Sequence, residues 1–261
     1  MRARRWSWID LCTPAAFVIF VASWELICDF WNVSALLVPP PSQIALALWQ
    51  ETVHGALLYN LGVTLFETAV GFAIAAALGI GLGAIIAEVD WFKRAVYPYL
   101  IAFQTVPKIA IAPLLVLWFG FGMTSKIVIA VTIAVFPILI NTIEGIWGTD
   151  RDRIDMVRAM RGSRWQVFWV VKFPTALPFI FAGLNVGIVF SLLGAVVGEF
   201  IGAQAGIGNL LIVANFRMDI ATVFAVLVTL GVTGYALHLL MALIQRKVVF
   251  WGSTARGQDY V

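Results

Sequence analysis

Four of the ionisable side chains inside, or at the end of, long apolar stretches could do chemistry: Lys108, Glu67, Glu144 and Glu199. A charge at the centre of a membrane helix costs about 2.5–3.5 kcal/mol on insertion scales, so such residues usually serve a function or form pairs. Lys108 either attracts an anionic solute, forms an ion pair with Glu67 or Glu144, or extends to an interface. Glu199 precedes a glycine-rich stretch, 202–208. This stretch is expected either to line the outer mouth of a path through the membrane or to form a turn.

The sequence lacks the patterns of an intramembrane enzyme or a nucleotide-binding protein. Its two histidines, His54 and His238, are far apart and belong to no metal-binding motif. A phosphate-binding loop reads G-x-x-x-x-G-K-[ST], whereas residues 120–126 lack the second glycine. Cys12 and Cys28 would lie about 24 Å apart on one helix, too far for a disulfide. We therefore expect no enzyme activity, metal or cofactor in this chain.

The composition is that of a membrane protein. Of the 261 residues, 62% are hydrophobic and 12% are charged, and the mean hydropathy is +0.96. A soluble domain carries about 25% charged residues, and a disordered chain has low hydrophobicity. Both classes are excluded.

Long apolar runs predict an all-helical fold, because about 20 apolar residues are needed for a helix to cross the hydrocarbon core. None of the runs shows the alternation of a barrel strand. Lys108 is about ten residues into the third run, roughly 15 Å deep and hence near the membrane midplane, with Pro107 and Pro113 on either side of it. The six predicted spans are 11–31, 60–87, 99–119, 126–147, 178–200 and 220–244.

Lysine and arginine placement orients these spans, because cytoplasmic loops are enriched in both. With both termini inside, 14 of the 17 basic residues lie on the cytoplasmic side. Lys126 and Arg217 lie outside, and Lys108 lies within a span. The basic net charge of +3 therefore reports topology and does not indicate a nucleic-acid partner. The N-terminal run is longer than a signal core, so we expect a retained helix.

Small residues at a spacing of four form two ridges. The first is Gly71, Ala75, Gly79 and Gly83, and the second comprises the glycines at 194, 198, 202 and 206. Such ridges let helices approach closely, either within one chain or between subunits. In the outer loop, Ser42 is expected to cap an amphipathic helix that ends near residue 52.

The inner loop 148–173 predicts a helical hairpin. Thr149 with Asp152, and Ser163 with Gln166, form two capping boxes that open helices at 150–161 and 164–172. Gly162 is expected to supply the left-handed residue between the helices. Pro174 and Pro178 are then expected to end the second helix and begin the next span. The hairpin either transmits force from another protein or anchors at the lipid headgroups.

Several motifs resemble the membrane subunits of binding-protein-dependent ABC importers, in the nitrate, sulfonate and taurine branch. The inner loop aligns with the family's cytoplasmic coupling motif. Asp155-Met156-Val157 stands where the family has a Glu-Ala-Ala triplet, and Arg161 stands at the family's glycine. The resemblance covers about residues 37–247 and is carried by LVPPPS at 37–42, TVPKIAIAPLLVLWFGFG at 105–122, TSKI at 124–127, FPILINT at 136–142 and GEFIG at 198–202.

The resemblance implies a six-helix permease of the type I ABC importer fold, as a single domain over 1–261. Its core covers about 56–247, and the span 11–31 and outer loop 32–55 are peripheral. The implied coupling residues are Asp155, Met156, Val157, Arg158, Arg161, Gly162, Ser163 and Pro174.

The resemblance also implies a set of partners. These are a second permease copy, an ATPase dimer that binds ATP and magnesium, and an extracytoplasmic binding protein in a bacterial plasma membrane. Small anionic or organic solutes would be the cargo, and Lys108, Glu67, Glu144 and Glu199 are candidates for the path. The alternative is a self-powered secondary carrier, although the two halves of the sequence show no clear internal repeat.

Overall fold

The computed structural model describes residues 8–31 and 34–251, and every regular element in these ranges is helical. Short 3₁₀ and π segments, η1 (Lys108–Ile111) and η2 (Phe168–Lys172), interrupt or extend the α-helices. The α-helices are α1 (Trp8–Phe30), α2 (Pro41–Val53), α3 (Leu57–Glu88), α4 (Asp90–Ala95), α5 (Tyr97–Thr105), α6 (Ala112–Phe119), α7 (Met123–Trp147), α8 (Arg151–Ala159), α9 (Arg164–Val167), α10 (Phe173–Phe200), α11 (Ile207–Phe216) and α12 (Ile220–Val248).

Helices α3, α7 and α10 form the centre of the bundle, and α7 makes the most extensive contacts with the other two. A side chain at Gly79 would meet Ile138, and one at Gly194 would meet the Ala130 backbone. Close backbone approach is the means by which helices associate in lipid. The α3 ridge and the α10 part of the second ridge therefore pack within the chain, which confirms the intramolecular alternative. Gly202 and Gly206 lie beyond the end of α10.

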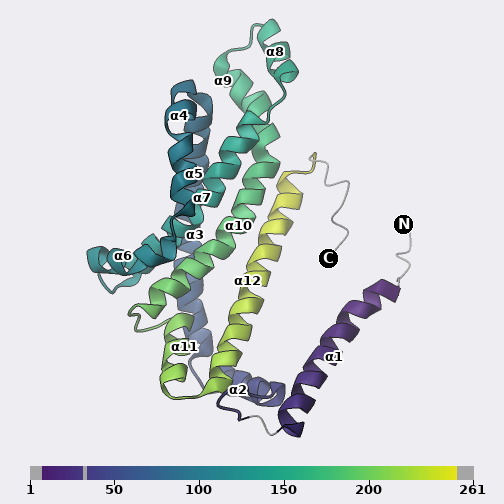
Figure 1. The fold of residues 1–261 in the computed structure, drawn as a ribbon. Helices are drawn as coiled ribbons and strands as arrows, with labels where there is room; N and C mark the ends of the chain where they lie inside the picture. The colour runs from purple at the N-terminus through teal and green to yellow at the C-terminus, as the bar shows by residue number, and fades with distance from the viewer. Residues whose placement is uncertain (1–7, 32–33, 252–261) are drawn as a thin grey trace.

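Four helical segments of the described chain are long and apolar enough to cross a membrane: Leu57–Glu88, Met123–Trp147, Arg164–Phe200 and Ile220–Val248. A fifth arises if the bent pair α5 and η1–α6 counts as one span. Helix α1 does not belong to this set, and its first half diverges from the bundle (Figure 1). The predicted count of six spans therefore remains a prediction.

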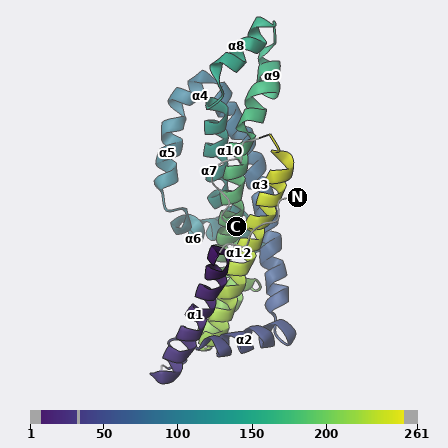
Figure 2. The ribbon, with the colours of Figure 1, turned by 90° about the vertical axis from the view of Figure 1, so that its right-hand side faces the viewer.

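The third predicted span is broken. Segments Tyr97–Thr105 and Lys108–Phe119 meet at an angle of 79°, and Figure 2 shows α5 running along the bundle before α6 turns across it. Val106 is extended at the break, as expected for the residue that precedes a proline. Pro107 lacks a backbone donor, so a helix cannot continue through it without loss of a hydrogen bond. The span predicted over 99–119 therefore consists of two helical segments and not of one continuous helix.

The two ends of the bundle differ. The hairpin of α8 and α9 projects from one end, and α2 and α11 lie at the other (Figure 1). The amphipathic helix predicted after Ser42 is α2, but Ser42 does not cap it. Instead, the Glu25 carboxylate on α1 accepts hydrogen bonds from the Ser42 backbone N–H (3.0 Å) and hydroxyl (2.6 Å). This contact joins α1 to the start of α2.

Candidate functional site

A cavity of about 560 Å³ lies beside the broken span. It is bounded by the end of α5, by η1, and by one face each of α7 and α10. Its described lining contains three polar side chains, Gln104, Lys108 and Asn141, and the rings of Phe136 and Phe190. The volume is in the range typical of small-molecule sites. The arrangement can therefore admit a solute with an apolar body and one electron-rich or anionic group.

The break in the span determines the position of Lys108, the first residue of η1. Its ammonium donates to the Gln104 carbonyl at 3.1 Å and lies 4.7 Å from the centre of the Phe136 ring. A cation over an aromatic face is stabilised by the ring quadrupole. Among the described residues, Lys108 forms no ion pair, so neither Glu67 nor Glu144 is its partner here.

The three acidic candidates lie elsewhere. Glu144 is exposed on α7 and faces Tyr97. Glu67 and Glu199 are 2% and 1% exposed, and they lie together in the bundle outside the cavity lining. The structure thus brings two of the four predicted path residues together, but not beside Lys108.

Sequence reasoning missed the residues that surround this carboxyl pair. Lys126, predicted on the outer side at the start of a span, is only 4% exposed on α7 and donates to the carbonyls of Phe121 (2.6 Å) and Gly122 (3.0 Å). On α3, Asn60, Thr64 and Glu67 are spaced four and three residues apart and are all buried. Because this spacing places residues on one helix face, it was a signal that could have identified the cluster.

The first helix of the predicted hairpin is α8, with a different cap from the one expected. Asp150 accepts from the Asp152 backbone N–H at 2.9 Å, and it is Asp150 that caps the helix. The Thr149 hydroxyl is buried and has no hydrogen-bond partner among the described residues. The predicted Thr149–Asp152 capping box is wrong, because the adjacent aspartate is also a strong N-cap residue.

The turn after α8 places the left-handed conformation on Arg161 (φ 60°) and not on Gly162. The Arg161 N–H donates to the Arg158 carbonyl, and the Gly162 N–H donates to the Val157 carbonyl, both at 2.9 Å. These two bonds form a Schellman motif, in which the residue before the last donor is left-handed. Gly162 is needed because a side chain there would collide with Val157.

The second half of the hairpin continues into the membrane-spanning helix. Both bonds of the predicted Ser163–Gln166 capping box are present, at 2.7 and 3.2 Å. From there α9, η2 and α10 form one apolar segment, Arg164–Phe200. Pro174 occupies the first turn of α10, and Pro178 lies inside it. The expected stop at these prolines is wrong, since the helical segment continues through both of them and η2 leads directly into α10.

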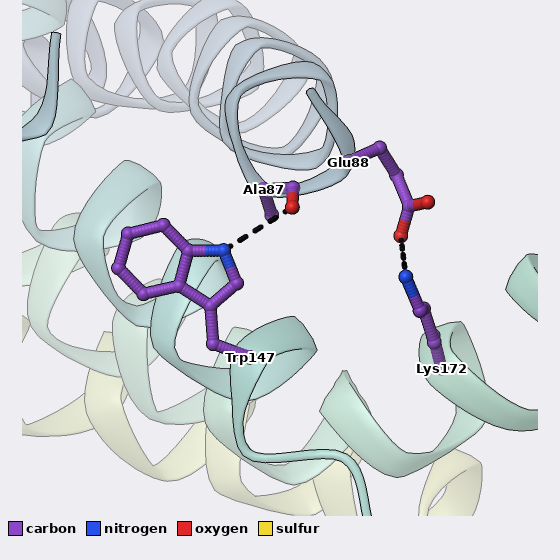
Figure 3. A network of polar contacts seen from close by, with 4 residues as sticks. All are labelled: Ala87, Glu88, Trp147 and Lys172. Atoms are coloured by element: carbon purple, nitrogen blue, oxygen red, sulfur yellow. Dashed lines mark hydrogen bonds and ion pairs between the residues drawn. The ribbon is translucent and has the colours of Figure 1, made fainter. Parts of the chain in front are cut away.

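Two contacts join the base of the hairpin to the end of α3 (Figure 3). The Lys172 ammonium lies 2.6 Å from the Glu88 carboxylate, and the Trp147 indole N–H donates to the Ala87 carbonyl at 3.2 Å. The ion pair is partly buried, so solvent screens it less than an exposed pair. These two contacts attach the base of the hairpin to α3.

The predicted coupling residues gather at the projecting end, except for Pro174 at the start of α10. Asp155 and Arg158 form an exposed ion pair at 3.6 Å, which contributes little stability in water. Met156, Met160 and Trp165 are exposed, Met160 to 79%. Exposed methionine and aromatic side chains are typical of protein interfaces.

The family profile "Binding-protein-dependent transport system inner membrane component" matches residues 79–250, which include the broken span, the hairpin and α10. The chain belongs to this family. As such it is a membrane permease subunit of an ABC importer.

Curated relatives of this permease match over most of its length. The riboflavin transport system permease protein of Chloroflexus aurantiacus is 34% identical over 248 residues, 95% of this chain and 92% of the relative. The formylaminopyrimidine transport permease protein of Halalkalibacterium halodurans is 34% identical and covers 79% of this chain and 86% of the relative. The taurine transport system permease protein of Escherichia coli is 26% identical, covering 96% and 94%.

The permease also has the fold of solved importer subunits. A chain of the inward-facing MetNI methionine ABC transporter superposes with a TM-score of 0.66 at 20% identity, covering 76% of this permease and 98% of that chain. The predicted class, an all-helical membrane protein with a type I importer permease fold, is therefore confirmed. Several apolar helices place the permease in the inner membrane as a multi-pass protein.

Replacement of Arg161 by glycine is expected to stabilise the permease by about 1 kcal/mol, because glycine adopts a left-handed backbone without the steric penalty of a side chain. The matched control is Arg158→Gly, three residues earlier inside α8, which is expected to lower stability by a similar amount. Thermal unfolding of the two purified variants in detergent measures both effects. A loss of stability in both variants would contradict the turn geometry.

Proposed function

We propose that this permease lines a translocation path and that the solute passes the cavity beside Lys108. The observation that carries the proposal is one half-buried lysine, the only charged side chain in the described lining of a mainly apolar cavity, at the break of a membrane span. Irregular backbone at membrane depth is tolerated where it is buried in protein or lines a water-filled space. The described lining contains no acidic side chain, so the site favours anionic or electron-rich groups.

We assign the energy source to a partner, because the sequence has no phosphate-binding loop. An ATPase dimer, which binds ATP and magnesium itself, would dock on the tip of the hairpin. The docking residues would be those predicted from the coupling motif, together with the exposed Met160 and Trp165. The contacts of Lys172 and Trp147 with α3 would carry its movement into the bundle.

The remaining partners follow from the family to which the chain belongs. Each copy of the chain would form one domain over 1–261. A second copy would close the translocation path on the side that the first copy leaves open. An extracytoplasmic binding protein would deliver the solute to the end that carries α2 and α11. The hairpin and both termini would then lie in the cytoplasm, as the basic residues predict.

The solute is expected to be small and organic or anionic. The names of the relatives range from riboflavin and formylaminopyrimidine to taurine. Both relatives at 34% identity are named for ring compounds, and the cavity offers Phe136 and Phe190 as apolar surfaces for a ring. A self-powered carrier remains the alternative in another class, and co-purification with an ATPase distinguishes the two.

Replacement of Lys108 by methionine is expected to lower uptake at least tenfold in vesicles that contain the complete transporter. The substitution keeps the length of the side chain and removes the only charge in the described cavity lining. The control is Lys247→Met, at an exposed position near the end of α12, which should transport normally. Unchanged uptake in the Lys108→Met variant would remove Lys108 from the path.

A further inference from the structure

Two carboxyl groups meet inside the bundle at the end opposite the hairpin, where α3, α10 and α11 come together (Figure 1). Glu67 on α3 and Glu199 on α10 are 2% and 1% exposed. The two groups are neighbours, because the hydroxyl of Thr64, one turn before Glu67 on α3, donates to Glu199, and their side chains interact with each other. Two ionised carboxylates cannot form a hydrogen bond, because neither carries a donor.

Glu199 accepts two hydrogen bonds from the surrounding protein, which suits the ionised member of this pair. The Thr64 hydroxyl donates to its Oε1 at 2.7 Å, and the Gly208 backbone N–H donates to its Oε2 at 2.5 Å. Side chains at Gly206 or Gly208 would collide with the carboxylate, so both glycines allow the backbone to approach it. Hydrogen bonds of this kind stabilise the ionised form of a carboxyl group.

The environment of Glu67 lacks the hydrogen-bond donors that surround Glu199. Its Oε2 is buried and finds no donor among the described residues. One positive charge lies nearby, on Lys126, whose ammonium also donates to two backbone carbonyls. Lys126 balances one carboxylate, so a second ionised carboxylate would leave a net negative charge in the interior of the bundle. Such a charge is costly unless it is paired.

We propose that Glu67 and Glu199 form a binding site for one proton, which is held at neutral pH on Glu67 and donated in a hydrogen bond to ionised Glu199. With this proton the cluster of Glu67, Glu199 and Lys126 is neutral, and the unpaired oxygen of Glu67 belongs to an uncharged carboxyl group. The site is independent of the proposed function, because it concerns the fold of the permease and not the solute.

The proton completes a network that attaches the start of α11 to α3. Asn60 Oδ1 accepts from the Gly206 N–H at 2.7 Å, and Thr64 Oγ1 accepts from the Ile207 N–H at 2.9 Å. Together with the Gly208 N–H bond to Glu199, these contacts satisfy N–H groups at the beginning of α11 that have no partner within the helix. Glu199 is thus shared between the proton site and the α11 attachment.

The structure predicts different effects on the melting temperature when glutamine replaces Glu67 and when it replaces Glu199. In Glu67→Gln the amide NH₂ replaces the acid O–H as donor to Glu199, so the melting temperature of the full chain should change little. In Glu199→Gln the amide loses one of the two acceptor oxygens that Thr64 and Gly208 use. We expect the melting temperature to fall by roughly 4 °C or more, since an unsatisfied buried polar group is destabilising.

Infrared spectroscopy of the full-length permease in detergent tests the proton itself. At neutral pH the wild-type protein should show the C=O stretching band of a buried protonated carboxyl group, and Glu67→Gln should lose that band. The absence of the band from the wild type, or its persistence in Glu67→Gln, would overturn the proposal. A Glu67→Gln variant that fails to fold, or that is destabilised as much as Glu199→Gln, would also overturn it.

Discussion

Deletion of residues 155–162 is expected to abolish ATP-driven uptake while the permease remains in the membrane. The deleted segment contains most of α8 and the Schellman turn, which form the projecting tip of the chain (Figure 1). The apolar segment that starts at residue 164 is outside the deletion, so insertion should be unaffected. Uptake into vesicles measures the first effect, and the amount of permease in the membrane fraction measures the second.

A charge reversal gives the same test with a smaller perturbation. Arg161→Glu keeps an L-amino acid at the left-handed position, so the backbone strain is unchanged and the charge of the docking surface is reversed. Arg217→Glu is the matched control, because Arg217 is also exposed but follows α11 at the opposite end. We expect at least a tenfold loss of uptake for Arg161→Glu and near-normal uptake for Arg217→Glu.

The deletion of residues 155–162 gives the decisive outcome for the hairpin. Normal transport by the deletion variant would show that the hairpin is not the coupling element.

Replacement of Gly194 by alanine is expected to destabilise the fold by about 1–3 kcal/mol, the usual range for overpacking. The added Cβ would lie 2.6 Å from the Ala130 Cα and 3.1 Å from the Ala130 backbone nitrogen. Because these are backbone atoms, α7 and α10 must separate, and no side chain can rotate to relieve the collision. The loss appears as a lower melting temperature in detergent and as reduced amounts of folded protein in membranes.

The control for this prediction is Gly81→Ala on α3, where no atom lies within 4 Å of the added Cβ. Alanine has a higher helix propensity than glycine by about 1 kcal/mol, so this variant should be as stable as the wild type or more stable. Equal loss of stability at both positions would mean that helix propensity, and not close packing of α7 against α10, decides the outcome.

Features that depend on local sequence could be predicted well. The apolar runs indicated the all-helical class, and the spacing of the small residues predicted two ridges for close helix approach. The structure shows that these ridges pack α3 and α10 on α7. The hairpin and its second capping box were also predicted from residues a few positions apart. These features depend on helix periodicity and on capping bonds between neighbouring residues.

Features that depend on competition or tertiary contact could not be predicted. Gly162 was expected to be left-handed, but the close approach of Val157 also requires glycine there, and Arg161 takes the left-handed position. Pro107 breaks its span whereas Pro178 does not, because the neighbouring backbone decides how a missing donor is accommodated.

The position of a charge along the sequence also did not determine its burial. Lys126 counted as an outer residue from topology alone, yet the fold buries it beside Glu67 and Glu199. The three residues come from three different helices, α7, α3 and α10. Only the packed bundle brings them together, so their meeting has no signal within any single segment.

Uptake by purified components tests most directly whether the permease is a passive path driven by a partner. The permease alone in sealed vesicles is expected to accumulate no solute, with or without ATP or an imposed ion gradient. Vesicles that also contain the ATPase and the binding protein should accumulate solute only when ATP is supplied. Accumulation by the permease alone, driven by an ion gradient, would contradict this account and identify the chain as a self-powered carrier.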